Sequence, residues 1–308
     1  MSVVKANRHL AEGLNGPPFH ATSFGAMARL RTLLVLGRTS NLPTVWSNCL
    51  AGWWLGGAGH AGNLPFLFAG ATFLYIGGMY LNDAFDVDFD RLHRKERPIP
   101  SGAISFGAVC QLGLFWLALG VACLFWVGLA AGVLAVTLAV SILIYDAVHK
   151  AFTFSPLLMG WCRCLVYLIA ATTAVRDNIG WPVWCGLALA AYVAGLSFIA
   201  RRESTRGSVE YWPLALLATP IALAFFMNAG DYRKPAAWLA LVLGVWLLRC
   251  LRRVWFGERN FVRAVSGLLA GIVFVDWLAV ADAPTWLGIV FLALFGLALL
   301  FQRFVPAT

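Results

Sequence analysis

Charged residues are scarce in this sequence, and their scarcity excludes a soluble fold. They make up 12% of the 308 residues, whereas hydrophobic residues make up 61%. Soluble globular domains carry about 25% charged residues. The net charge of +9 is not the mark of a nucleic-acid-binding surface, because the basic residues lie between apolar segments. The composition predicts an all-α protein that crosses the lipid bilayer several times and has no nucleic-acid partner.

A cleavable leader and a cysteine framework are also missing. Residues 1–30 contain no apolar run of signal-peptide length, so we expect the first membrane span to direct insertion. We expect residues 1–30 to form a flexible cytoplasmic tail and residues 31–308 to form a single transmembrane domain. Most of the seven cysteines fall inside apolar runs, which indicates neither a disulfide framework nor a zinc site.

Long apolar segments, in contrast, are abundant. Each is close to the roughly 20 residues that a helix needs to cross a bilayer. The shortest covers residues 236–251. The ten segments are 40–58, 63–84, 105–126, 128–148, 155–175, 181–200, 212–229, 236–251, 261–281 and 284–304.

The basic residues are distributed unevenly around these segments. With ten spans and a cytoplasmic N-terminus, 19 of the 23 Lys and Arg lie on the cytoplasmic side. Arg176, Arg233 and Lys234 lie on the other side, and Arg163 lies within a span. Membrane proteins show this asymmetry because cytoplasmic loops retain positive charge. We therefore expect ten spans with both termini in the cytoplasm, and a location in a bacterial inner membrane.

The most informative stretch lies at the end of the second apolar segment and holds four of the 14 acidic residues. If it is helical, Asn82, Asp86 and Asp90 share one face at positions i, i+4 and i+8. Asp83 lies beside that face, and Asp88 points away from it. Carboxylates that converge need a cation between them, and oxygen ligands of this kind suit Mg²⁺. The alternative, a solvated acidic helix end, is disfavoured by this spacing and by the basic loop that follows.

That basic loop, residues 91–102, completes a recognisable motif. Residues 82–90 read Asn-Asp-x-x-Asp-x-x-x-Asp, and residues 97–102 read Arg-Pro-Ile-Pro-Ser-Gly. Carboxylates followed by cations suit a metal–diphosphate ligand, because the cations bind phosphate oxygens. The two motifs closely resemble the first aspartate-rich motif and adjoining loop of UbiA-type intramembrane prenyltransferases.

The resemblance implies a fold, an activity and a cofactor. The fold would have nine core helices around a central cavity, with an additional tenth helix here. The activity would be Mg²⁺-dependent transfer of a prenyl group from a prenyl diphosphate to a hydrophobic acceptor, aromatic or lipid, within the bilayer. Asp83, Asp86 and Asp90 would be the catalytic and metal-binding residues, and Asn82 would orient them. The substrate diphosphate would be neutralised by Arg97, Lys150 and Arg163.

The first span supplies further candidates for substrate binding. Arg38 matches by position an arginine near the start of the family's first helix. Asn41, Thr44 and Asn48 share a helix face, on which polar side chains would line a cavity or bond to another helix. Both interpretations remain open for Asn48.

Three other polar residues near or inside the spans stand out. Lys150 follows Tyr145 in an arrangement that resembles the family's Tyr and Lys pair facing the diphosphate, although an i, i+4 ion pair with Asp146 is the alternative. Arg163 would face the aspartates or the diphosphate, unless its side chain extends to the membrane surface. Asp276 is equally unusual inside a span, but the sequence identifies no partner for it.

The resemblance weakens where the family carries its second aspartate-rich motif. The corresponding stretch, residues 195–206, has one acid, Glu203, together with Arg201, Arg202 and Arg206. One interpretation is that Glu203 and Arg202 bind substrate, with arginine replacing a second metal ion. The other is a non-catalytic protein that binds or transports an isoprenoid-like metabolite. CDP-alcohol phosphotransferases also place aspartates in membrane helices, but their motif opens with Asp-Gly, which is not found here.

Overall fold

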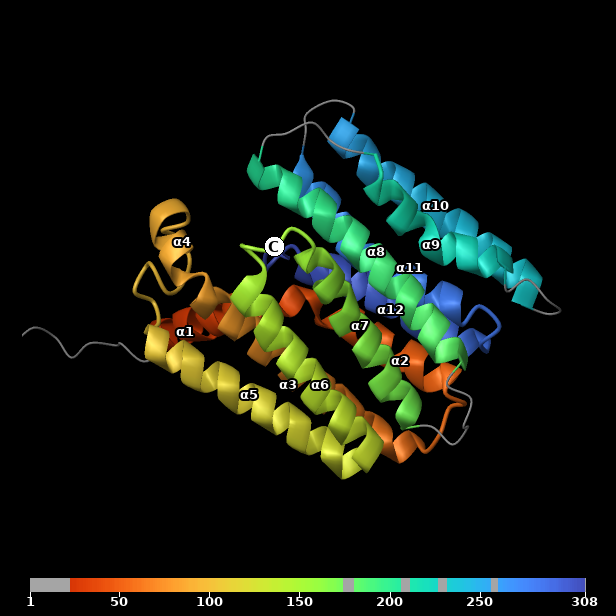
Figure 1. The fold of residues 1–308 in the computed structure, drawn as a ribbon, viewed down its shortest axis with the longest axis horizontal. Coiled ribbons are helices and arrows are strands. Elements are labelled where there is room, and N and C mark those ends of the chain that lie inside the picture. The colour runs from red at the N-terminus through yellow and green to blue at the C-terminus, as the bar shows by residue number, and fades with distance from the viewer. Residues whose placement is uncertain (1–22, 174–179, 206–210, 227–231, 256–259, 308) are drawn as a thin grey trace, which may run out of the picture.

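The computed structural model describes residues 23–173, 180–205, 211–226, 232–255 and 260–307. Within these residues the chain is helical and has no β-strand (Figure 1). Seven helices are long and apolar enough to cross a membrane by length and composition. Two further apolar helices, Pro213–Phe226 and Thr285–Phe301, are shorter. The predicted all-α membrane architecture is confirmed.

Each of the ten predicted segments coincides with one helix. The ten are α2 (Leu42–Leu55), α3 (Leu64–Phe85), α5 (Phe106–Val127), α6 (Leu129–Val148), α7 (Ser155–Thr172), α8 (Gly180–Thr205), α9 (Pro213–Phe226), α10 (Arg233–Trp255), α11 (Phe261–Ala279) and α12 (Thr285–Phe301). Short 3-10 turns, η2 (Thr39–Asn41) and η3 (Ala61–Asn63), precede α2 and α3.

Two helices fall outside the predicted segments. Helix α1 (Ser23–Leu36) begins within the stretch that we expected to be a flexible tail, whose residues 1–22 lie outside the described residues. The short helix α4 (Val87–His93) follows the acidic motif. Neither segment is apolar enough to be recognised as a span.

The hydrophobic core is divided between two halves of the bundle. One cluster packs α3, α5 and α6 and includes Leu74, Leu124 and Leu138. The other packs α8 to α12 and includes Leu189 and Phe291. Helices α2 and α7 contribute to both clusters, and they lie between the two halves in Figure 1. Helices α2 and α7 therefore join the two halves.

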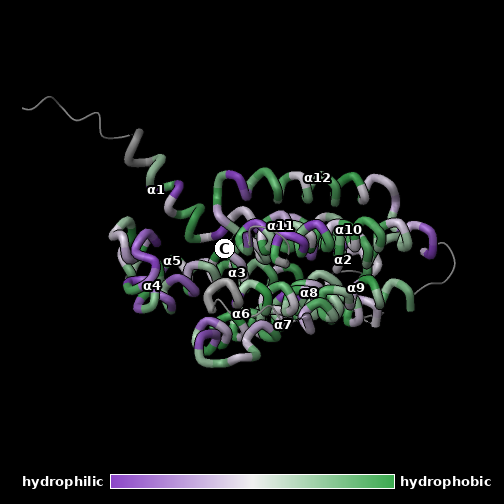
Figure 2. Tube along the Cα trace, turned by 90° about the horizontal axis from the view of Figure 1, so that it is seen from above, coloured by the Kyte–Doolittle hydropathy of each residue, from purple (hydrophilic) through white to green (hydrophobic). Residues whose placement is uncertain are grey.

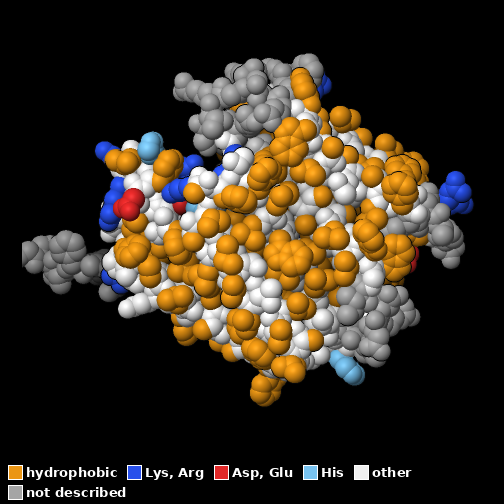
Figure 3. All heavy atoms as spheres, viewed as in Figure 1, with side chains coloured by type: hydrophobic (Ala, Val, Ile, Leu, Met, Phe, Trp, Pro, Cys, Tyr) orange, Lys and Arg blue, Asp and Glu red, His pale blue; other side chains and the backbone are white. Residues whose placement is uncertain are grey.

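Polar residues collect at one end of the bundle. Hydrophilic positions gather around α4 and the adjoining loop in Figure 2. In Figure 3 most of the visible surface is hydrophobic, whereas acidic and basic side chains gather mainly at the edge that carries α4. This distribution is typical of a bundle with lipid around its sides.

Helices α3 and α5 touch through their backbones. A Cβ atom added at Gly77 would lie 2.8 Å from the carbonyl oxygen of Gly113, and one added at Gly120 would lie 2.9 Å from that of Gly70. Small residues at such contacts let membrane helices approach closely. The acidic motif at the end of α3 is thereby held against α5, which begins just after the basic loop.

The acidic motif does not continue α3 as one straight helix, contrary to our expectation. Helix α3 ends at Phe85, Asp86 lies at the bend, and α4 starts at Val87. The bend retains its hydrogen bonds, since the amide of Asp86 donates to the carbonyl of Asn82 and the amide of Asp90 donates to that of Asp86. The chain turns where the apolar segment ends, so the aspartates follow two helix axes rather than one.

Candidate active site

A cavity of about 290 Å³ lies at the polar end of the bundle. Its lining comes from helices α3, α6, α7, α8 and α11 and from the basic loop. This agrees with the predicted fold, in which helices surround a central cavity. Its basic lining residues are Arg38, Arg94, Arg97, His149, Arg163 and Arg201. No aspartate or glutamate that the structure describes belongs to the lining. The cavity therefore presents a surface suited to an anion.

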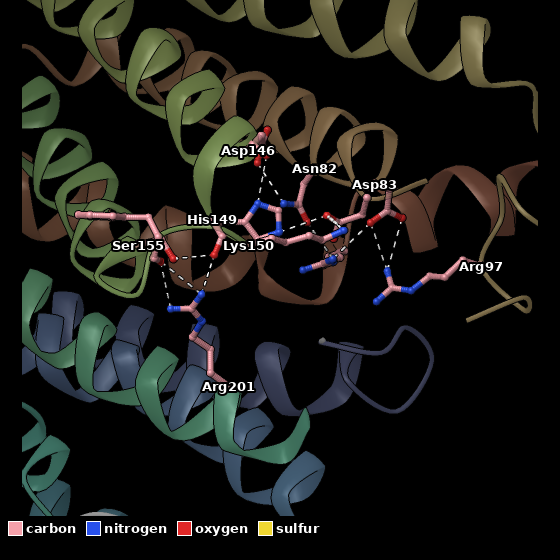
Figure 4. A network of polar contacts seen from close by, with 11 residues as sticks. Asn82, Asp83, Arg97, Asp146, His149, Lys150, Ser155 and Arg201 are labelled. Atoms are coloured by element: carbon pink, nitrogen blue, oxygen red, sulfur yellow. Dashed lines mark hydrogen bonds and ion pairs between the residues drawn. The ribbon is translucent and has the colours of Figure 1, made fainter. Parts of the chain in front are cut away.

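Asp83 lies behind this surface, paired with two of the arginines. Its side chain is buried and accepts from Arg38 at 3.3 Å and from Arg97 at 3.2 Å. Asn82 accepts from Arg38 at 3.2 Å and donates to Asp146 on α6 at 3.0 Å (Figure 4). Asn82 thus orients Arg38 and joins α3 to α6.

Asp86 is paired with the chain that follows α6. Its Oδ1 lies 2.7 Å from Lys150 Nζ and 3.1 Å from His149 Nε2. Burial would raise the pKa of Asp86, but the hydrogen bonds from His149 and Lys150 outweigh it and lower the pKa below the ordinary value. Burial would likewise lower the pKa of His149, and the bond to Asp86 raises it instead. The alternative pairing of Lys150 with Asp146 is not the one the structure shows.

Asp90 and Asp88 lie on opposite sides of α4. Asp90 is 2% exposed, and its Oδ1 has no hydrogen-bond donor in the described part of the chain. Burial raises the pKa of Asp90 above its ordinary value, although the charge of Arg97 acts to lower it. The charges of Asp86 and Asp83 add to the rise. The side chain of Asp88 is 90% exposed and pairs with Arg91, so it points away as predicted.

The three aspartates do not form a preassembled metal cluster. Among the described residues, no group of three or more His, Cys, Asp and Glu side chains is arranged to hold a metal ion. The reason is electrostatic, since Asp83 and Asp86 are each turned toward two basic side chains. The donor chemistry nevertheless fits Mg²⁺, because all three ligands are carboxylates and the buried Oδ1 of Asp90 has no partner.

Arg163 does not face the aspartates of the acidic motif. Its guanidinium donates to Asn48 Oδ1 at 2.8 Å and to Thr44 Oγ1 at 3.3 Å, and it lies over the ring of Tyr75 at 5.7 Å. It still reaches the cavity wall. Of the two partners expected for Arg163, the structure does not show the acidic motif, because acceptors on α2 hold the side chain, and the diphosphate stays a prediction.

Asn48 and Asp276 form a buried network beneath the cavity. Both are 0% exposed. Asn48 Nδ2 donates to the Asp276 carboxylate at 2.8 and 3.0 Å, Tyr167 donates to it at 2.6 Å, and Ser47 donates to it as well. Asn48 thus bonds between helices, as the alternative for it proposed, and does not line the cavity. These donors are the partners that the sequence could not identify for Asp276.

Asn41 does line the cavity. It lies in η2, and its Nδ2 donates to the carbonyl of Ala307 at 2.9 Å. The hydroxyl of Tyr75 donates to the backbone carbonyl of Arg38 next to this turn. Of the two asparagines expected at the cavity from the first span, the structure places only Asn41 in its wall.

The end of α8 supplies Arg201 to the cavity. The guanidinium of Arg201 donates to the carbonyls of His149 at 2.6 Å and Thr153 at 2.7 Å (Figure 4). It thereby holds the loop between α6 and α7. Arg202 and Glu203 lie on α8, but their side chains are outside the described residues.

Sequence reasoning missed three members of the site. Arg94, in the basic loop, and His149, next to Lys150, line the cavity, but neither is among the residues that the sequence predicts for the site. Tyr75 lies four residues before Met79 on the face of α3 that lines the cavity, and this spacing is the one signal that could have identified it.

A second, apolar cavity of about 80 Å³ adjoins the first. Tyr75, Met79, Tyr145, Met159 and Arg163 line both. The remaining lining is mostly aliphatic and comes from α2, α3, α6 and α7: Val45, Ala71, Leu74, Gly78, Leu138, Ile142, Asp146, Cys162 and Val166. A cavity lined by basic side chains thus adjoins a hydrophobic one.

Comparison with known proteins is consistent with this arrangement. A digeranylgeranylglyceryl phosphate synthase of Thermococcus gammatolerans is 31% identical over 168 residues, which cover 54% of this chain and 52% of the relative. In sequence the chain thus spans about half of that relative's length.

Two solved structures share the fold. A UbiA homologue from Aeropyrum pernix K1 matches with a TM-score of 0.62 at 18% identity, over 80% of this chain and 98% of that one. A UbiA homologue from Archaeoglobus fulgidus bound to GPP and Mg²⁺ matches with a TM-score of 0.59 at 15% identity, over 87% of this chain and 98% of that one. Residues 40–260 also match the model of the UbiA prenyltransferase family. This match spans most of the chain, and the protein therefore belongs to the UbiA prenyltransferase family.

Proposed function

We propose that the protein transfers a prenyl group from a prenyl diphosphate to a hydrophobic acceptor, aromatic or lipid, inside the membrane and with Mg²⁺ as cofactor. One observation carries the proposal. The cavity lined by arginines adjoins the apolar cavity through shared lining residues. A prenyl diphosphate has the same two parts, an anionic head and an apolar tail.

The arginines of the cavity would bind the diphosphate and stabilise it as the leaving group. Arg38 and Arg97 lie in the cavity wall next to Asp83, so their guanidinium groups are already close to where charge would develop on the leaving oxygen. Fixed donors aimed at developing charge are a large contribution to catalysis. Guanidinium groups suit the task because they bind phosphate oxygens in pairs. His149 also lines the cavity, and Lys150 follows it in the chain and pairs with Asp86.

The metal would be held by Asp83, Asp86 and Asp90. When bound, Mg²⁺ supplies positive charge to the diphosphate oxygens. Asp90 offers a buried oxygen without a donor, and Asp86 is kept ionised by its neighbours. The Archaeoglobus fulgidus homologue bound to GPP and Mg²⁺ supports Mg²⁺ as the metal.

The prenyl tail would lie in the apolar cavity, with its reactive carbon at the junction. Tyr75 and Tyr145 line both cavities, so aromatic rings lie where a carbocation would form. Aromatic faces attract cations. Exclusion of water from this junction would favour reaction with the acceptor over hydrolysis.

The test is an assay in reconstituted membranes. Purified protein would receive Mg²⁺, radiolabelled prenyl diphosphates of several lengths and a lipid extract as acceptor pool. We expect a prenylated lipid product and stoichiometric release of diphosphate from at least one substrate. Reconstituted membranes without the protein serve as the control for background hydrolysis. Absence of product with every substrate, while the ligand still binds, would sink the enzymatic proposal.

That result would favour the second candidate, a protein that binds or transports an isoprenoid-like metabolite. Its supporting observation is the composition of the cavity wall on α8. The described residues that line the cavity there are Val193, Leu196, Ser197, Ala200 and Arg201, with no acid among them. A second metal site is therefore not built from this part of the wall.

We also propose that the polar end of the bundle faces the cytoplasm, with both termini on that side. The basis is the positive charge of the loops at that end. Lys95→Cys should react with a membrane-impermeant maleimide only from the cytoplasmic side, in a background without other cysteines. His60→Cys, in the loop between α2 and α3, is the control for the opposite side. Labelling of position 95 from outside would reverse the orientation.

A further inference from the structure

The chain beyond α12 folds back into the bundle. Val305 and Ala307 are 8% and 5% exposed, whereas Phe304 is 71% exposed. The C-terminal end lies over the body of the molecule in both Figure 1 and Figure 2. Ala307 belongs to the wall of the cavity, together with Arg38 and Asn41. Residues 302–307, here called the tail, are thus part of the site.

Two carbonyl groups of the tail accept hydrogen bonds from η2. Asn41 Nδ2 lies 2.9 Å from the carbonyl oxygen of Ala307, and Ser40 Oγ lies 3.4 Å from that of Pro306. Ser40 and Asn41 are 0% and 4% exposed. A buried donor left without a partner costs about 1–3 kcal/mol. The tail therefore provides acceptors for two buried donors of this turn.

The start of the tail is fixed as well. Gln302 Nε2 donates to the carbonyl of Ser266 on α11 at 3.0 Å. Helix α12 itself packs against α2, α11 and η2. The tail is consequently attached at both of its ends, to α11 and to η2.

The turn that the tail holds places a functional side chain. Arg38 immediately precedes η2 and has φ 40° and ψ 47°, in the left-handed region that non-glycine residues seldom adopt. Such a backbone costs roughly 1–3 kcal/mol and persists only where its surroundings fix it. From this position the Arg38 guanidinium reaches Asn82 and Asp83. Loosening η2 would release Arg38 from the cavity wall.

We infer that the tail is a positioning element for the diphosphate end of the cavity: by holding η2, it fixes Arg38 against Asp83. The inference rests on the proposed function, in which Arg38 binds the diphosphate. It also gives the tenth predicted span, α12, a role at the site, because α12 leads the chain to the tail that contacts η2. It also explains why Val305 is buried while its neighbour Phe304 is exposed.

The test measures the binding of inorganic diphosphate to the full-length protein in detergent by calorimetry. Val305→Ser removes the apolar anchor of the tail and should weaken binding about fivefold, within the range for residues of one network. Phe304→Ser, at the exposed neighbour, should bind like wild type. Arg38→Gln should also weaken binding. In the Arg38→Gln background Val305→Ser should add no further loss, because the tail acts through Arg38.

If the tail had a purely structural role, Val305→Ser would lower the thermal midpoint of unfolding. Its effect on binding would then add to the effect of Arg38→Gln. If Val305→Ser does not fold, Asn41→Ala removes the bond to Ala307 directly, and it should likewise add nothing to Arg38→Gln. Additive losses, or wild-type binding by Val305→Ser, would overturn the inference and leave the proposed function standing. A wild-type protein that binds no diphosphate would overturn the proposed function itself, and with it this inference.

Discussion

Lys150 forms its ion pair with Asp86 at the bend after α3, at 2.7 Å, and not with Asp146 four residues before it. His149 contacts the same carboxylate at 3.1 Å. Two basic groups that follow α6 thus neutralise an acid that follows α3. The acidic and basic parts of the site are paired with each other across the bundle.

Asp86 and Asp88 should behave differently despite lying two residues apart. Asp86→Asn should reduce Mg²⁺-dependent binding of a prenyl diphosphate at least about tenfold, because a carboxylate ligand is lost. Asp88→Asn should bind like wild type, since its side chain is 90% exposed. Calorimetry with and without Mg²⁺ measures both. Equal losses in the two variants would contradict the assignment of Asp86 as a metal ligand.

Arg97 should contribute to diphosphate binding without a metal. Arg97→Gln removes a cation of the cavity wall that is 16% exposed and paired with Asp83. We expect the Kd for inorganic diphosphate to rise about tenfold, as for the loss of one charged hydrogen bond. Lys95→Gln, at an exposed position of the same loop, is the matched control. A similar loss in both variants would indicate long-range attraction rather than a specific contact.

Asp276 should be important for stability. Asp276→Asn replaces one of two carboxylate oxygens, which accept from Ser47, Asn48 and Tyr167, by an NH2 group that can only donate. We expect the free energy of unfolding to fall by about 3 kcal/mol. Unfolding in mixed micelles measures it, with Asp282→Asn at an exposed position as the control. A change below about 0.5 kcal/mol would show that the buried network tolerates the loss.

Gly77 should not accept a larger side chain. Its Cβ would lie 2.8 Å from the backbone oxygen of Gly113, so Gly77→Val should separate α3 from α5 and lower stability by about 1–3 kcal/mol, as overpacking does. Gly107→Val on α5 is the control, because no atom lies within 4 Å of its added Cβ. Comparable thermal midpoints for the two variants would mean that the helices do not touch in this way.

Hydropathy alone predicted the ten helices, because a chain in lipid has few ways to satisfy its backbone except as helices. The acidic motif and basic loop were equally visible, since charges beside apolar segments are rare and informative. The bend at Asp86 was not visible, because the motif has helical spacing on both sides of it.

The pairing of side chains could not be predicted from one sequence. Whether Lys150 pairs with Asp146 or with Asp86 depends on how α6 packs against α3. Arg163 donates to Asn48, which lies 115 positions away in the sequence. The tail was missed for a different reason. It has no helical periodicity, its single charged residue is Arg303, and its role depends on two backbone carbonyls, which carry no residue signature.

The ion pairs at Asp83 and Asp86 have a thermodynamic consequence. A divalent cation that binds these carboxylates must displace arginine, lysine or histidine, and an anion that binds those side chains must draw them from the carboxylates. Each ligand alone therefore breaks contacts that the other could replace. Metal and diphosphate should accordingly bind with positive cooperativity, and by linkage each should raise the affinity for the other by the same factor. The site would therefore bind the metal alone or the diphosphate alone weakly, and it would bind the metal–diphosphate complex more tightly.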